Sequence, residues 1–287
     1  MNSNNLKSLI TVIVLYETKI TDSATYKSLD SALVHFDSDL DLIIYDNSNI
    51  AHNDQRTFHL HKLRKTNFHD AENPGVSKAY NVAASYAQRL KKNWILLLDQ
   101  DTSFDVNIFH CYQESIEMYP DVKLFAPILK LSSGEIFSPC RYLFKRGFHL
   151  KSIKPGIHSL KNISPVNSGM LIDLNCFVSV GGYNEKVKLD FSDFQFIERF
   201  RSQVNKFVVV NSTAFQDFSD SLTEIDQKLN RYRIYCECAR SCDVKSTSDL
   251  LQYSLVTFLR ALKLILKFKS HKFIIVWINT FVLKKRD

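Results

Sequence analysis

The sequence has few of the residues that mark loosely folded or cross-linked chains. Its 287 residues include only seven glycines and six prolines, too few for a linker-rich protein. The six cysteines form no CxxC pair, and the cluster Cys236, Cys238 and Cys242 lacks the usual zinc spacing. The first apolar run, residues 8–16, meets Glu17 without a small-residue cleavage site, so no secretory signal is expected. We therefore expect free thiols in a cytoplasmic protein.

The sequence also lacks an apolar run long enough to cross a membrane. The C-terminal stretch 273–283 has eleven residues, whereas a spanning helix needs about 20. The net charge of +7 is local, because residues 251–287 contain one acid, Asp287, and eight basic side chains: Arg260, Lys263, Lys267, Lys269, Lys272, Lys284, Lys285 and Arg286. Basic residues confined to a tail do not form a nucleic-acid groove, so no nucleic-acid partner is expected.

The tail itself has the pattern of an amphipathic basic helix. In residues 251–268, one set of apolar positions recurs at helical spacing: Leu251, Leu255, Phe258, Leu259, Leu262, Ile265 and Leu266. Arg260, Lys263 and Lys267 lie on another face. We expect this region to lie on the inner face of the plasma membrane as a peripheral anchor. The alternative is a helical hairpin that packs on the rest of the protein or forms a homodimer.

Between the termini, apolar runs rich in β-branched residues alternate with helical segments. The runs cover residues 9–16, 40–46, 94–101, 122–129, 169–174 and 206–211. Their continuous hydrophobicity predicts strands covered on both faces, as in an α/β fold with a mostly parallel central sheet flanked by helices. We expect this α/β domain over residues 1–220 and a C-terminal helical region over residues 221–287.

Acidic side chains end one of these strands. Asp99 and Asp101 follow the apolar run of residues 94–98 and alternate, so they point to the same side of an extended chain. Ligands bind beyond the carboxyl ends of parallel strands, and Mg²⁺ or Mn²⁺ prefers carboxylate oxygens. The pair could therefore hold such an ion, but taken alone it is equally typical of a strand that ends in a polar turn.

Four stretches in this order are LIIYDNSN (42–49), NPGVSKAYN (73–81), WILLLDQD (94–101) and the segment from Ser168 to Arg199, which contains GGYNEKVKLDFSDFQFIER. Together they resemble family 2 glycosyltransferases of the GT-A fold, and in particular their rhamnosyltransferase-like branch. The resemblance covers roughly residues 8–220.

The resemblance implies a donor site built from three of these stretches. Asp46 matches the acid that contacts the nucleobase, although an Asp in DNSN is equally typical of a turn. The resemblance assigns the metal and the donor diphosphate to Asp99 and Asp101. It places further donor-binding residues in the loop and helix of residues 73–81, namely Asn73, Gly75 and Asn81.

The fourth stretch supplies the implied catalytic acid. Asp193 matches the general base of the family, Gln195 stands where the family often has Glu, and Arg199 lies close to a donor-side Arg. Acids in this region are also typical of the first turn of a helix, which is the alternative for Asp193. On the acceptor side, the resemblance places Ser168, Gly169 and Asp190.

One departure concerns the metal site. Related enzymes often have a His shortly after the last core strand, where this chain has Gln216 followed by Asp217. We therefore expect either that Asp217 replaces the His as an oxygen ligand or that the metal is held more weakly.

The resemblance implies an inverting, metal-dependent glycosyltransferase with Mg²⁺ or Mn²⁺ as its cofactor. It would move a sugar, with rhamnose favoured, from a dTDP- or UDP-sugar to a lipid-linked or growing bacterial surface glycan. The missing His keeps an alternative open, a non-catalytic protein that binds nucleotide sugar or serves as a scaffold of a glycan-assembly complex.

Overall fold

The computed structural model describes residues 8–36, 39–52, 63–216 and 224–283. Its first half contains four parallel strands in the order β3-β2-β1-β4. These strands are β1 (Leu9–Leu15), β2 (Leu40–Asp46), β3 (Leu63–His69) and β4 (Trp94–Asp99). Helices α1 (Ala24–Phe36) and α2 (Val76–Arg89) connect them, after a 3-10 turn at Ile20–Asp22. The predicted parallel sheet is confirmed.

The continuous apolar runs become strands because helices cover the sheet on both faces. All seven residues of β1 are buried. Leu9, Ile13 and Leu15 face a cluster formed with α1 and α3, whereas Ile10 and Val12 face a cluster formed with α2 and α5. Each fully buried aliphatic side chain contributes about 1.5–3 kcal/mol to stability. This two-sided burial anchors the strand ends that carry polar residues.

The second half completes a mixed sheet of twelve strands among the described residues. Its strands are β5 (Thr102–Ser103), β6 (Leu124–Leu131), β7 (Ile136–Leu143), β8 (Arg146–Leu150), β9 (Gly156–Ser159), β10 (Ile163–Ser164), β11 (Met170–Asp173) and β12 (Lys206–Gln216). Its helices are α3 (Ile108–Met118), α4 (Leu174–Ser179) and α5 (Ser192–Phe200). Strand β12 pairs with β5, with Gln216 opposite Thr102. This register brings the end of β12 beside Asp101.

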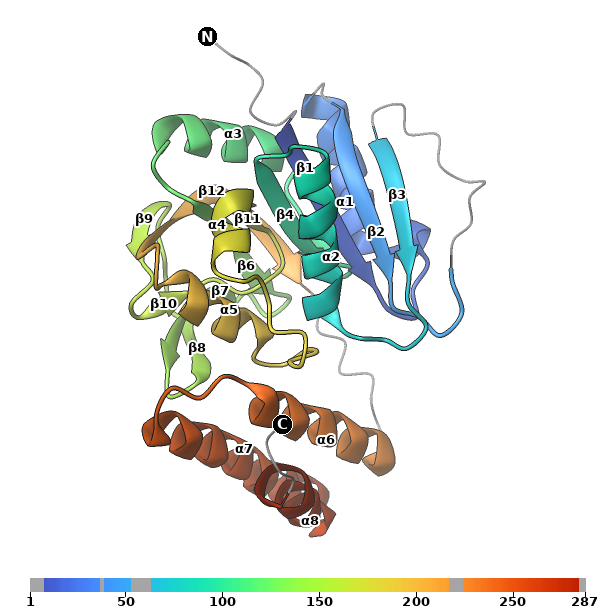
Figure 1. The fold of residues 1–287 in the computed structure, drawn as a ribbon, viewed down its shortest axis with the longest axis vertical. Helices are drawn as coiled ribbons and strands as arrows, with labels where there is room; N and C mark the ends of the chain where they lie inside the picture. Colours follow the sequence, from blue (N-terminus) through green and yellow to red (C-terminus); the bar gives the residue numbers. More distant parts are fainter. Residues whose placement is uncertain (1–7, 37–38, 53–62, 217–223, 284–287) are drawn as a thin grey trace.

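The C-terminal helices pack together beneath this body, with α6 nearest to it (Figure 1). They are α6 (Ile225–Ser241), α7 (Thr247–Phe268), α8 (Lys272–Trp277) and a π-helical turn (Ile278–Val282). Tyr232, Cys236, Tyr253 and Phe273 belong to their shared core. The predicted domain boundary after residue 220 lies within residues 217–223, outside the described part of the chain.

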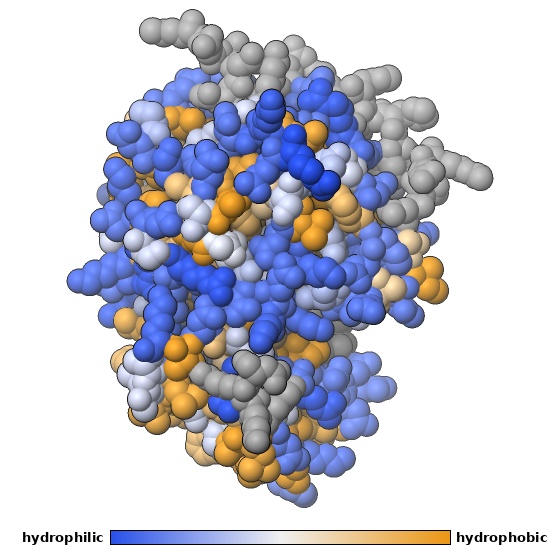
Figure 2. Space-filling model, in the orientation of Figure 1, coloured by the Kyte–Doolittle hydropathy of each residue, from blue (hydrophilic) through white to orange (hydrophobic). Residues whose placement is uncertain are grey.

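Helix α7 is amphipathic, as predicted, but its apolar residues face two ways. Tyr253, Val256 and Ala261 are buried in the helical region. The leucines that the sequence pattern singled out stay largely exposed, at 39–81%: Leu251, Leu255, Leu259, Leu262 and Leu266. Figure 2 shows hydrophobic side chains at this lower end of the molecule. Among the described residues, no helix combines the length and apolar character that a membrane crossing requires.

Candidate functional site

A cavity of about 1030 Å³ opens at the carboxyl edge of the sheet. It lies at the point where the strand order reverses. Strands β2 and β3 lie on one side of β1, and β4 lies on the other. In open α/β sheets, ligands bind in the crevice at this switch point. Tyr16 from the end of β1, Asn47 after β2 and Asn73 before α2 line it, together with Asp99 and Asp101.

Asp99 and Asp101 form an acidic corner of this cavity, and Gln216 lies beside them. Its Nε2 donates a hydrogen bond to Asp101 Oδ1 at 3.1 Å. Its Oε1 is buried and has no hydrogen-bond partner among the described residues. Asp99, Asp101 and this amide oxygen form an oxygen-only donor set, which suits Mg²⁺ or Mn²⁺. Asp217, the predicted replacement for the His, lies outside the described residues.

The described residues contain no cluster of three or more His, Cys, Asp or Glu side chains arranged to hold a metal. The donor set at the corner combines two carboxylates with one amide instead. Mg²⁺ is commonly bound through one or two protein carboxylates, with substrate phosphates and water completing its shell. The residues present therefore fit such an ion.

Asp99 is held in place by neutral hydrogen-bond donors. Its Oδ1 accepts hydrogen bonds from the Tyr80 hydroxyl and from Asn167 Nδ2, both at 2.9 Å. Its main-chain N–H donates to Ser168 Oγ at 3.0 Å. Burial raises the pKa of Asp99, although these side-chain donors oppose the shift. The carboxylate is therefore rigidly positioned at the end of β4.

Asp193 lies at the start of α5, next to the same network. It accepts a hydrogen bond from the Tyr183 hydroxyl at 3.2 Å and another from the main-chain N–H of Asn167. Burial, and then the negative charge of Asp99, raise its pKa to about 7. A carboxyl with a pKa near neutrality is suited to general-base catalysis. One residue, Asn167, thus contacts both acids.

Asp46 has a different environment from the one expected for a nucleobase ligand. Its side chain is fully buried, and its two oxygens accept main-chain N–H groups of Ser48 at 2.9 Å and His52 at 2.8 Å. These are the contacts of a turn-forming Asp, the alternative that the sequence left open. The neighbouring Asn47 lines the cavity. A contact between Asp46 and a nucleobase stays a prediction.

Gly75 and Asn81 join α2 to the segment that leads into α5. A Cβ on Gly75 would lie 2.1 Å from the Lys188 carbonyl oxygen, and its φ of +89° also disfavours a side chain. The Asn81 amide donates to the Tyr183 carbonyl and accepts from its N–H, both at 2.9 Å. Gly75 lines the cavity and Asn81 does not. A direct donor contact for either residue stays a prediction.

Asp190 and Arg199 hold the helical region against the body. Asp190 forms a two-pronged ion pair with Arg231 of α6. Arg199 pairs with Asp243 at 2.6 Å. Asp190 and Arg199 are thus used in packing contacts, and neither lines the cavity. Their predicted roles toward acceptor and donor stay predictions.

Ser168 and Gly169 are buried at the end of β4. Ser168 is 1% exposed, and its hydroxyl holds the Asp99 main chain. A Cβ on Gly169 would lie 2.8 Å from Pro127, so a glycine is needed for this close packing. Neither residue lines the cavity. Their predicted role in acceptor binding stays a prediction.

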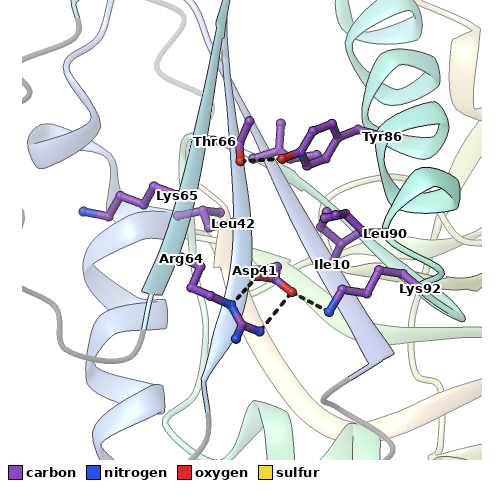
Figure 3. A pocket seen from close by; sticks show the side chains of 10 residues that line it. Ile10, Asp41, Leu42, Arg64, Lys65, Thr66, Tyr86, Leu90 and Lys92 are labelled. Atoms are coloured by element: carbon purple, nitrogen blue, oxygen red, sulfur yellow. Dashed lines mark hydrogen bonds and ion pairs between the residues drawn. The ribbon is translucent and has the colours of Figure 1, made fainter.

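A second cavity lies at the opposite end of the strands. There, Asp41 at the start of β2 is bound by Arg64 at 2.7 Å and by Lys92, while Thr66 and Tyr86 are joined at 3.2 Å (Figure 3). Burial alone would raise the pKa of Asp41, but the two cations lower it below the ordinary value. Asp41 is thus paired with two cations, and Thr66 is paired with Tyr86, which indicates a structural role for these side chains.

No family model matches the chain, and no curated protein matches it by sequence. Solved structures do match. The crystal structure of S. aureus TarS 1–349 is 15% identical with a TM-score of 0.57, covering 94% of this chain and 78% of its own. The same protein in complex with UDP-GlcNAc is 14% identical with a TM-score of 0.56, and the match covers 95% of this chain and 79% of that structure.

GalNAc-T7 with UDP, GalNAc and Mn²⁺ is 12% identical with a TM-score of 0.56, and the match covers 81% of this chain. The chain spans 48% of GalNAc-T7 and 42% of a longer TarS structure, less than half of either. At these identities the matches establish the fold. The expected GT-A architecture is confirmed.

Proposed function

We propose that this chain is a glycosyltransferase that uses a nucleoside diphosphate sugar. The observation that carries the proposal is the meeting of Asp99, Asp101 and Gln216 at the switch-point cavity of a GT-A fold, with Asp193 linked to Asp99 through Asn167. The carboxyl ends of β1 and β2, with Tyr16 and Asn47, are the expected position of the nucleoside.

The acidic corner suits the diphosphate of such a donor. Asp99, Asp101 and Gln216 would hold Mg²⁺ or Mn²⁺ through oxygen atoms. A bound ion of this kind supplies charge neutralisation for the departing diphosphate. Tyr80 and Asn167 keep Asp99 fixed, so its carboxylate needs no rearrangement when the ligand binds.

Asp193 is the proposed general base. It would take the proton of the acceptor hydroxyl while that oxygen attacks the anomeric carbon and the bond to the diphosphate breaks. Such proton transfer contributes a factor of roughly 10²–10⁴ in rate. A single displacement inverts the anomeric centre and needs no enzyme nucleophile.

The substrates are proposed from similarity. UDP is present in the complexes of TarS and GalNAc-T7, which makes a UDP-sugar the first donor to test. The motif resemblance favours rhamnose carried on dTDP. The proposed acceptor is a lipid-linked or growing bacterial surface glycan.

A membrane surface is the proposed location of the acceptor. The exposed leucines of α7 stand beside exposed basic residues, Arg260, Lys263 and Lys267. An apolar face flanked by cations suits the interface of an anionic membrane, here the inner face of the plasma membrane. A homodimer through the same helices is the alternative.

Thermal unfolding with a panel of UDP- and dTDP-sugars tests the proposal. Ligands that bind only the folded state raise the melting temperature, so at least one nucleotide sugar should do so in MnCl₂ and not in EDTA. Asp101→Ala should remove this metal-dependent shift. Asp121→Ala, an exposed Asp before β6 and far from the cavity, is the matched control.

Transfer is then measured with the nucleotide sugar that binds. No metal-dependent binding by any member of the panel would refute the proposal. Binding without donor hydrolysis or transfer would instead support the non-catalytic scaffold.

A further inference from the structure

One long face of α6 turns toward the cavity. Its lining residues recur at intervals of three and four positions along the helix and include Gln227, Asn230, Arg231, Ile234, Glu237 and Ser241. Residues at this spacing share one helix face. The acidic corner and α6 are therefore walls of the same cavity.

The side of α6 that faces the cavity is polar. The other side of the helix makes its apolar packing contacts. Leu229, Tyr232, Cys236 and Ala239 bury α6 in the core of the helical region. A helix that only covered the body would turn apolar side chains toward it. Here five of the six side chains named above carry hydrogen-bonding groups, so the face is suited to a polar ligand.

The face is also held rigidly against the body. Arg231 is ion-paired with Asp190, and the Tyr235 ring lies 4.7 Å from Phe191. The Ser241 carbonyl accepts a hydrogen bond from Asn184 at 3.1 Å. Binding sites of defined geometry need such support behind the side chains that contact the ligand.

The cavity has room for more than the donor. Its volume of about 1030 Å³ is at the upper end of the range of roughly 300–1,000 Å³ for small-molecule sites. The donor is expected at the ends of β1 and β4, where the strand order reverses. The wall formed by α6 is then left for a second ligand.

The charges on this side are mixed. Lys186, Lys188 and Arg231 line the cavity together with Glu72 and Glu237. A purely cationic wall would favour a polyanion, whereas mixed donors and acceptors match hydroxyl groups, which both donate and accept. Amide side chains such as Asn230 have the same dual capacity.

We propose that the polar face of α6 is the binding site for the sugar acceptor and contacts its hydroxyl groups. This inference rests on the proposed glycosyl transfer, and it assigns the acceptor site to the C-terminal helical region. Gln227 and Asn230 lie at the exposed rim of the cavity, where an extended glycan enters.

The test measures binding of n-octyl glycosides of glucose, galactose, N-acetylglucosamine and rhamnose to the full chain, with and without UDP and MnCl₂. The double variant Gln227→Ala with Asn230→Ala should weaken binding of the glycosides that bind the wild type about tenfold. Its affinity for UDP should change less than about twofold. Both side chains are exposed, so the fold should be retained, which a melting curve checks.

Arg233→Ala is the matched control, because Arg233 is an exposed residue of α6 that faces the opposite side, near Lys272. It should leave glycoside binding unchanged. Equal glycoside binding by the double variant and the wild type would overturn the inference, and so would a wild type that binds none of the glycosides. Failure of UDP to bind while a glycoside still binds through α6 would count against the proposed donor chemistry alone.

Discussion

Replacing Asp193 by Asn should stabilise the protein at alkaline pH while abolishing transfer. The Asp193 carboxyl has a pKa of about 7 in the folded chain, against an ordinary value of 3.8. The folded state therefore binds this proton more tightly than the unfolded state does. Stability falls as the pH rises from about 4 to about 7, because ionisation is then easier in the unfolded chain.

The magnitude follows from the shift. About three pKa units correspond to about 4 kcal/mol. Asp193 is partly exposed, and solvent screening reduces this figure to about 2 kcal/mol. Asn cannot ionise, so the variant does not lose this folding stability as the pH rises. Its amide oxygen can accept the Asn167 N–H, and its NH₂ group can donate to the Tyr183 hydroxyl, so both contacts have a substitute.

Denaturant unfolding of wild type and variant at pH 4.5 and pH 8, in EDTA, measures the effect. The variant should gain about 2 kcal/mol over the wild type at pH 8, or several degrees in melting temperature, and much less at pH 4.5. Asp190→Asn is the matched control, because it weakens the ion pair with Arg231 and should destabilise at pH 8. If Asp193→Asn also destabilised at pH 8, the assignment of a base whose pKa is raised in the folded state would be refuted.

Three further changes test other contacts. Gly75→Ala should destabilise the fold by about 1–3 kcal/mol in denaturant unfolding, because its Cβ would overlap the Lys188 carbonyl at a positive φ; an unchanged midpoint would contradict this contact. Gln216→Ala should raise the Mn²⁺ concentration for half-maximal transfer by about tenfold, and an unaltered metal titration would remove Gln216 from the metal site. Leu255→Asp with Leu259→Asp should abolish sedimentation with anionic vesicles and preserve UDP binding, whereas retained sedimentation would favour a protein-packing role for this face.

The sheet could be predicted from the sequence because its signal is local. The seven consecutive buried residues of β1 appear as LITVIVL, which is apolar at every position except Thr11. The acids at the end of β4 also follow a local apolar run, Trp94 to Leu98: Asp99 is the last residue of the strand and Asp101 lies just beyond it. Tyr80 belongs to the stretch NPGVSKAYN, yet its hydroxyl contact with Asp99 depends on how α2 packs.

Contacts between distant residues could not be predicted in this way. Gln216 meets Asp101 across 115 residues, and Asn167 meets Asp99 across 68. Both depend on the antiparallel insertion of β11 beside β4 and on the pairing of β12 with β5. The polar face of α6 had a local signal, polar residues at helical spacing, but the sequence does not indicate which surface the helix covers.

The segment from the glycine turn to Arg199 combines chemistry with assembly. Asp193 is adjacent to the acidic corner, whereas Asp190 and Arg199 bind α6 and the segment that follows it. The residues three and six positions from Asp193 thus hold α6, one wall of the cavity, and the segment after it in place. A change in either ion pair should therefore move α6 relative to Asp193 and alter acceptor use before it alters the sheet. This coupling explains how one short motif can include an acid, Asp190, and a cation, Arg199, that do not line the cavity.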